Sequence, residues 1–224
     1  MYLEKSKTWY FSIPKVACSS LKGMCFQAEF GTRFQKSKFA ETHKRLHDLY
    51  PSERVVKVRR KVRKLKKQGV WTFTVVRHPV DRIISCYESK VLQETQKMKK
   101  VSEKDLEKYG ISREPSLAEF IEKLDDYCKA SWVIKRHAQP LHYFLGKKPD
   151  LFDRIFDISE MDEIVAEVNK RAGSEVALPW RNKSGIKVNK EEVTPEIVAK
   201  IEKDFASDLE LFGDYLGPSK YTVS

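Results

Sequence analysis

Two segments of the chain share one plan, an apolar strand followed by a turn and a helix, and this plan limits the folds that the chain can adopt. The first segment, residues 9–29, reads WYFSIPKVACSSLKGMCFQAE, and the second, residues 70–90, reads VWTFTVVRHPVDRIISCYESK. The second begins with a nearly continuous apolar run, which is typical of strands buried on both faces of a parallel sheet. Each segment therefore predicts a buried strand that leads through a short turn into a helix.

Helical and strand patterns alternate along the rest of the chain. Helices are predicted at residues 55–67, 80–95, 117–128 and 131–145, with Pro140 interrupting the last of these, and a third strand at 152–158 precedes helices at 160–172 and 195–212. Residues 97–113 are charged and show no clear periodicity. This order predicts the α/β class, with a single three-layer domain over residues 1–224 and a central, mostly parallel sheet.

The charge balance favours anionic ligands. The 224 residues include 43 Lys and Arg against 32 Asp and Glu, which gives a formal net charge of +11. Such a charge attracts nucleotides, nucleic acids and sulfated glycans alike. The basic run at 57–67 could recognise an acidic glycan or a nucleic acid, but its apolar stripe favours a solvated helix packed on the core.

Cysteine usage and hydropathy bear on the compartment. The sequence has no apolar stretch of about 20 residues, the length that a membrane-spanning helix needs. No CxxC pair occurs, and reduced, packed thiols are typical of proteins kept inside the cell. We therefore expect a cytoplasmic chain without a membrane span. The cysteines in question are Cys18, Cys25, Cys86 and Cys128.

The turn of the first segment carries groups that bind a phosphate or a sulfate. Backbone amides at a helix start, a lysine and hydroxyl groups together suit such an anion, and residues 14–20 supply all of them. Either Ser19 or Ser20 is expected to cap the helix. The pattern GxxxxGK[ST] is absent, so the turn does not predict an ordinary P-loop NTPase. An ordinary cap is the alternative role for Ser19.

The turn of the second segment offers a different group. Arg77 follows the apolar strand directly, and its guanidinium fork matches the geometry of a phosphate. Ser85, on the following helix, could share that phosphate. The alternative for Arg77 is a helix-capping or ion-pairing role.

At this point the two motifs resemble those of a known family. The stretch IPKVACSSLKG resembles the 5′-phosphosulfate loop of the sulfotransferases, and VVRHPVDRIISCYESK resembles their 3′-phosphate motif, in the form found in carbohydrate sulfotransferases of the HNK-1 and chondroitin/dermatan type. The likeness continues more loosely through residues 135–140, 152–164 and 178–184. It implies a P-loop-NTPase-like sulfotransferase fold and transfer of a sulfuryl group from 3′-phosphoadenosine 5′-phosphosulfate (PAPS) to a hydroxyl acceptor, with a carbohydrate as the expected class.

The same resemblance implies roles for individual residues. The 5′-phosphosulfate would be bound by Lys15, Ala17, Cys18, Ser19 and Ser20. The 3′-phosphate would be bound by Arg77 and Ser85, and a loop of Asn182, Lys183 and Ser184 would close over the nucleotide. Lys15 would also stabilise the leaving oxygen, and no metal is expected.

A base must accept the proton of the acceptor hydroxyl. In glycan sulfotransferases of this kind the base is often a histidine between the two nucleotide motifs, which here means His43 or His47. A neutral imidazole with a pKa of about 6.5 can accept a proton near neutral pH, so either histidine could serve. We favour His43, with His47 as the alternative base. Surface histidines without function are the competing interpretation. His137 is expected to line the acceptor cleft, and His78 to be structural.

Two other functions fit part of the sequence. A P-loop-like nucleotide-binding kinase would use the same strand, turn and helix, although no convincing magnesium-binding aspartate follows a strand. A basic nucleic-acid-binding protein would explain the net charge but not the paired motifs, so no nucleic-acid partner is expected. Because glycan-acceptor relatives commonly carry a Golgi anchor, an excised Golgi-lumenal catalytic domain is the alternative compartment. The sequence predicts no oligomeric state.

Overall fold

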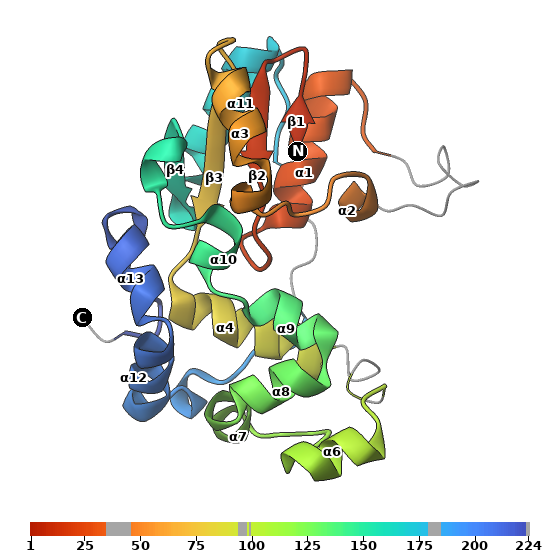
Figure 1. Cartoon of the computed structure of the whole chain (residues 1–224), viewed down its shortest axis with the longest axis vertical. Coiled ribbons are helices and arrows are strands. Elements are labelled where there is room, and N and C mark those ends of the chain that lie inside the picture. Colours follow the sequence, from red (N-terminus) through yellow and green to blue (C-terminus); the bar gives the residue numbers. More distant parts are fainter. Residues whose placement is uncertain (35–45, 94–97, 99, 179–184, 223–224) are drawn as a thin grey trace. The chain divides into compact units, whose positions relative to one another are not determined.

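The structure, a computed structural model, describes residues 1–34, 46–93, 98, 100–178 and 185–222 (Figure 1). The chain divides into two compact units. The first comprises Met1–Val76 and Leu141–Lys183, and the second comprises Arg77–Pro140 and Ser184–Ser224. The assignment of residues 1–224 to a single domain stays a prediction.

The first unit contains a four-stranded sheet in the order β1-β2-β3-β4. Strands β2, β3 and β4 are parallel, and β1 pairs with β2 in the antiparallel direction. The expected α/β class with a mostly parallel sheet is therefore confirmed. The short edge strand β1 was not predicted, because two residues are too few to show a period. The strands are β1 (Tyr2–Leu3), β2 (Thr8–Phe11), β3 (Trp71–Val76) and β4 (Arg154–Asp157).

Helices cover both faces of this sheet, as the aromatic side chains show. Trp9 of β2 lies opposite Thr72 of β3, so Trp9 and Trp71 project from different faces. The Trp9 ring lies 5.3 Å from the Lys61 amine of α3 (Val55–Lys66), and the Trp71 ring lies 4.2 Å from the Arg171 guanidinium of α11 (Met161–Ala172). Helix α1 (Cys18–Phe30) packs against α11, and α10 (Leu141–Leu145) packs against α3.

Local sequence explains where the helices of the first unit begin and end. Gly31 takes a left-handed conformation with φ of 68° and donates its N–H to the Gln27 carbonyl, which ends α1 as a glycine C-cap does. In α3, Val55 and Val62 are buried, so the predicted amphipathic helix is confirmed. The remaining short elements are α2 (Leu46–Leu49), η3 (Pro149–Leu151) and η4 (Ile158–Glu160).

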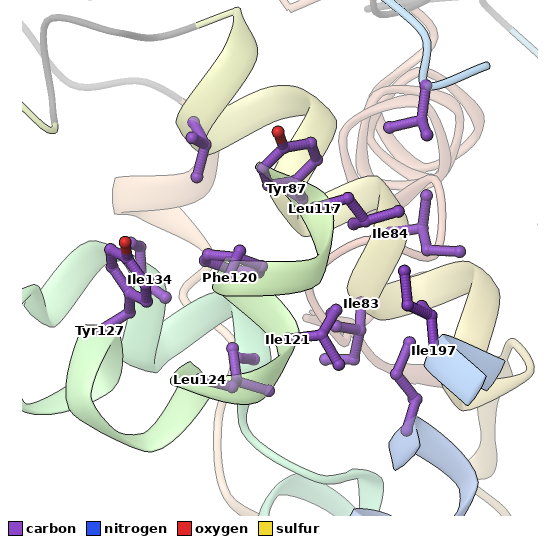
Figure 2. Packing of buried hydrophobic residues seen from close by; sticks show 14 of the residues in the cluster. Ile83, Ile84, Tyr87, Leu117, Phe120, Ile121, Leu124, Tyr127, Ile134 and Ile197 are labelled. Carbon is purple, nitrogen blue, oxygen red and sulfur yellow. The ribbon is translucent and has the colours of Figure 1, made fainter. Parts of the chain in front are cut away.

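The second unit is helical throughout its described part. Its core packs Ile83 and Ile84 of α4 (Pro79–Tyr87) with side chains of α7 (Leu117–Glu122), α8 (Leu124–Ala130) and α12 (Pro195–Asp204) (Figure 2). Helix α4 continues as the π-helix η2 (Glu88–Leu92). The other elements are α6 (Glu103–Tyr109), α9 (Trp132–Ala138), η5 (Lys190–Glu192), α13 (Ala206–Phe212) and η6 (Gly213–Tyr215).

Several predicted helices are divided in the structure. The expected helix at 117–128 breaks at Lys123, and the one at 195–212 breaks at Phe205. The helical stretch at 131–145 is interrupted at Pro140 as predicted, because proline lacks the N–H that a continuous helix needs. Helix α6 was missed because its charged sequence has only one buried side chain, Leu106.

Candidate functional site

The turn between β2 and α1 has an uncommon backbone. Lys15 and Ala17 have φ angles of 69° and 55°, in the left-handed region that non-glycine residues enter at a cost of about 1–2 kcal/mol each. Val16, between them, is buried. Left-handed residues that alternate with others turn successive amides toward one side, and such a concavity binds anions. Strained backbone of this type gathers at ligand-binding sites.

The predicted helix cap is wrong. Ala17 is the N-cap residue, and Ser19 and Ser20 lie within the first turn of α1. The helix begins at Cys18, before the two serines that were predicted to cap it, and the left-handed residues Lys15 and Ala17 precede this start. An alanine has no side-chain acceptor, and Ala17 makes no side-chain cap. Within the described ranges, this helix start therefore presents its first-turn amides without a capping side chain, an arrangement that favours a bound anion.

A histidine from α2 lies at this helix start. The Nε2 atom of His47 is 2.8 Å from the Ser19 hydroxyl oxygen, and its Nδ1 atom is 3.2 Å from the Lys22 amine. Lys22 is fully buried on α1, and its amine also donates to the Tyr50 carbonyl at 2.6 Å. The residues Ser19, His47 and Lys22 thus form a connected polar group beside the turn.

The Lys22 contact was missed by sequence reasoning. Lys22 looked like one more cation on a basic chain, and its helical neighbours are apolar. The signal that could have found it is its spacing, since Lys22 follows Ser19 by three residues and so lies on the same side of α1. A lysine on the buried side of a helix needs a polar partner.

The turn after β3 is built differently. His78 caps α4, because its Nδ1 atom accepts the Val80 N–H at 3.4 Å, and Pro79 occupies the first helical position. The expected structural role of His78 is thus confirmed. A guanidinium nitrogen of Arg77 lies 3.8 Å from Oδ1 of Asp81. The ion-pairing alternative for Arg77 is therefore present in this structure, in a long and weak form.

Asp81 connects Arg77 to the C-terminal segment. Its Oδ2 atom accepts the Lys220 N–H at 3.2 Å, while its buried Oδ1 atom has no hydrogen-bond partner among the described residues. Ser85, half-buried, follows Asp81 by four residues on α4 and so lies on the same side of the helix. Arg77, Asp81 and Ser85 form a polar row along the start of α4.

Two further buried charges lie on α4 and its π-helical continuation. Arg82 is fully buried, and burial lowers its pKa while the Asp208 carboxylate opposes that shift. Glu88 is 1% exposed and accepts from the Lys187 amine at 3.0 Å and the Val188 N–H at 3.3 Å. Glu88 therefore anchors the chain that follows residues 179–184.

The structure places the predicted site residues in two groups. The first group surrounds the start of α1 in the first unit and comprises Lys15, Ala17, Cys18, Ser19, Ser20 and His47. Arg77 and Ser85 lie on or beside α4 in the second unit, and His137 lies on α9 with its Nδ1 atom 2.7 Å from the Val133 carbonyl oxygen. Outside the described residues lie His43, Asn182, Lys183 and Ser184.

Other candidate sites are less informative. A surface hollow beside Trp71 and Arg154 lies at the amino ends of β3 and β4, away from the turn that follows β2. Within the described ranges, no group of His, Cys, Asp and Glu side chains has the arrangement of a metal site. The same ranges contain no helix long and apolar enough to cross a membrane.

The parallel strands and the covering helices define an α/β protein. The chain belongs to the sulfotransferase family, whose Sulfotransfer_2 model matches residues 1–215. Comparisons with curated proteins and with solved structures gave no significant match. Family membership makes the protein a transferase that moves a sulfuryl group to a hydroxyl acceptor, and members of this family typically use PAPS.

Proposed function

We propose that this protein transfers the sulfuryl group of PAPS to a hydroxyl group of a carbohydrate. The observation that carries the proposal is the turn at Lys15 and Ala17, where an uncapped helix start, a cation and two hydroxyl-bearing residues lie together in a chain of the sulfotransferase family. Main-chain amides bind the non-bridging oxygens of a phosphosulfate without needing the glycines of a P-loop.

The reaction forms one bond and breaks one bond. The acceptor oxygen attacks sulfur in line, and the bond between sulfur and the bridging oxygen of the donor breaks. The products are a sulfate ester and 3′-phosphoadenosine 5′-phosphate (PAP), and the acceptor proton passes to a base. In this proposal Lys15 stabilises the negative charge on the leaving oxygen. The amides of Cys18, Ser19 and Ser20 and the hydroxyls of the two serines surround the phosphosulfate.

The roles at the other end of the nucleotide follow from the second turn. We assign the 3′-phosphate to Arg77 and Ser85, because a guanidinium and a hydroxyl both donate to phosphate oxygens. Binding a dianionic phosphate replaces the weak 3.8 Å pairing of Arg77 with Asp81 by shorter, charge-assisted hydrogen bonds. Asn182, Lys183 and Ser184 are proposed to close over the nucleotide, and His137 to line the acceptor side.

His43 is the proposed base, and His47 is the alternative. His43→Ala should abolish turnover and leave PAP binding intact, measured with labelled donor and by calorimetry. Retained turnover in His43→Ala, with loss in both His47→Ala and His47→Gln, would move the base to His47.

The direct test of the donor is calorimetric titration of the wild-type protein with PAP, AMP and ADP. We expect PAP to bind most tightly, because only PAP offers the 3′-phosphate. Equal affinity for PAP and AMP would refute the donor assignment. A screen of glycan and non-glycan hydroxyl acceptors with labelled PAPS then tests the acceptor class, and turnover confined to non-sugar alcohols would refute a carbohydrate acceptor.

A further inference from the structure

In the polar group formed by Lys22, His47 and Ser19, the donor and the acceptor of each hydrogen bond can be assigned. A lysine ammonium carries three donors and no acceptor, so the His47 Nδ1 atom 3.2 Å away must accept a hydrogen bond from it. A neutral imidazole that accepts at one nitrogen carries its proton on the other. The His47 proton is therefore on Nε2, the atom that faces Ser19.

That proton fixes the hydroxyl of Ser19. The His47 Nε2–H donates to the Ser19 oxygen at 2.8 Å, so the serine's own hydrogen cannot point toward the ring. Ser19 belongs to the first turn of α1, directly beyond the left-handed Ala17. Its hydroxyl hydrogen is thus left to donate to a group other than His47.

A buried lysine needs polar partners, and Lys22 has them. Lys22 is fully buried, and its second contact, to the Tyr50 carbonyl at 2.6 Å, holds the amine close to the His47 ring. Hydrogen bonds in series polarise one another where the surroundings have a low dielectric constant. The charge of Lys22 therefore strengthens the donor character of His47, and through it that of the Ser19 hydroxyl.

We propose that Lys22 is a positioning residue that holds His47 as a hydrogen-bond donor, and that His47 in turn directs the Ser19 hydroxyl toward the bound anion. His47 in this arrangement has no lone pair facing Ser19, so it is not the base of the reaction. The assignment of the anion rests on the proposed function, whereas the proton position on His47 does not.

Nuclear magnetic resonance of the wild-type protein tests the proton position directly. Long-range proton-nitrogen correlation on protein with nitrogen-15 label, with the His47 signals assigned by their loss in His47→Gln, should show Nε2 protonated and Nδ1 unprotonated at neutral pH. In Lys22→Met the Nδ1 atom should lose its donor, and the nitrogen shifts of His47 should change. A wild-type ring protonated at Nδ1, or at both nitrogens, would overturn the proposal whether or not the variants fold.

Turnover in two His47 variants separates a donor from a base. Glutamine keeps an N–H donor near the position of Nε2 but cannot accept a proton, so His47→Gln should retain most of the turnover that His47→Ala loses. Equal and complete loss in both variants would assign His47 as the base and overturn the proposal. His142→Gln, on α10 of the same unit, is the matched control and should behave as wild type.

Binding of PAP tests the contribution of the hydroxyl. Ser19→Ala should weaken PAP binding about 10-fold, the lower end of the range for losing one hydrogen bond to a charged group. His47→Ala should weaken it by a similar factor, and the double variant by little more than either alone, because the residues act in series. Fully multiplicative losses would contradict the series. Failure of wild-type protein to prefer PAP over AMP would instead refute the proposed function and leave the proton position standing.

Discussion

The turns after β2 and β3 begin alike in sequence and differ in what they present. The turn at Lys15 and Ala17 takes a strained backbone and starts α1 without a side-chain cap, so it presents amides and hydroxyls. The turn at Arg77 is regular, with His78 as the cap and Pro79 as the first helical residue, and it presents one cationic side chain. The turn after β2 therefore offers mainly main-chain donors, and the turn after β3 offers a side-chain donor.

The helices that follow these turns also differ in how they bury a charge. Lys22 on α1 and Arg82 on α4 are both fully buried. Lys22 donates to the Tyr50 carbonyl and to His47, whereas Arg82 donates to the His137 carbonyl, and its Nε and Nη2 atoms make no hydrogen bond within the part of the chain that the structure describes. Lys22 therefore contacts a residue of the candidate site, whereas the charged form of Arg82 is favoured by the Asp208 carboxylate.

The largest effect is expected when the compensation of Arg82 is removed. Asp208→Asn removes the carboxylate whose charge favours the buried Arg82 guanidinium, and we expect the free energy of unfolding to fall by up to about 3–5 kcal/mol, the cost of a buried charge that loses its compensation. Urea denaturation measures this loss. The control is Asp204→Asn, because Asp204 pairs with Lys200 at the surface and such pairs contribute about 0.2–1 kcal/mol. Equal losses in the two variants would show that Asp208 does not compensate Arg82.

The next effect concerns the nucleotide. Arg77→Ala should weaken PAP binding about 10–100-fold, the usual range for a lost charge-assisted hydrogen bond. AMP binding should change little, because AMP lacks the 3′-phosphate. Calorimetry measures both affinities. The control is Arg113→Ala, because Arg113 lies in the same unit and donates hydrogen bonds to the Met98 carbonyl and the Glu103 carboxylate. An equal loss of affinity for AMP would show that Arg77 does not bind the 3′-phosphate.

Substitutions in the two turns should change stability with opposite signs. Ala17→Gly removes the cost of a left-handed alanine and should raise the free energy of unfolding by about 0.5–1 kcal/mol, after the greater freedom of glycine in the unfolded chain is included. His78→Ala removes a helix cap and should lower it by about 1 kcal/mol. Urea denaturation of both variants decides, and a destabilising Ala17→Gly would show that the turn is not strained.

The smallest effect is a change in labelling rate. Cys18, in the first turn of α1, is half-buried, whereas Cys25 is buried and its pKa is raised to about 12 by burial. Because the thiolate is the reactive form, iodoacetamide at pH 8 should modify Cys18 and leave Cys25 unmodified. PAP should slow the modification of Cys18 a few-fold, as measured by peptide mass spectrometry. Unchanged labelling in saturating PAP would place the nucleotide away from this turn.

Much of the fold was predictable because its signals are local and periodic. The apolar run at β3, the stripe of α3 and the glycine that ends α1 each determine an element by themselves. The breaks at Lys123 and Phe205 were not predictable, because the helical periodicity continues through both positions. They depend on how the segments pack in the helical unit.

The candidate site was predictable in part. Lys15, Ser19 and Arg77 could be proposed from the sequence, because each follows a predicted strand. The cap at Ala17 was missed, because a left-handed alanine has no signature in sequence. The contact of His47 with Ser19 and Lys22 was also missed, because it joins residues 25 and 28 positions apart through tertiary packing.

The strained turn at Lys15 and Ala17 has a consequence for the working range of the protein. Peptide N–H groups neither gain nor lose a proton between about pH 4 and 10, unlike carboxylates and imidazoles. A cradle made from main-chain amides therefore keeps the same donors in acidic and alkaline solution. The part of the donor affinity that these amides contribute should consequently vary little with pH, whereas a phosphate monoester such as the 3′-phosphate changes its charge near pH 6.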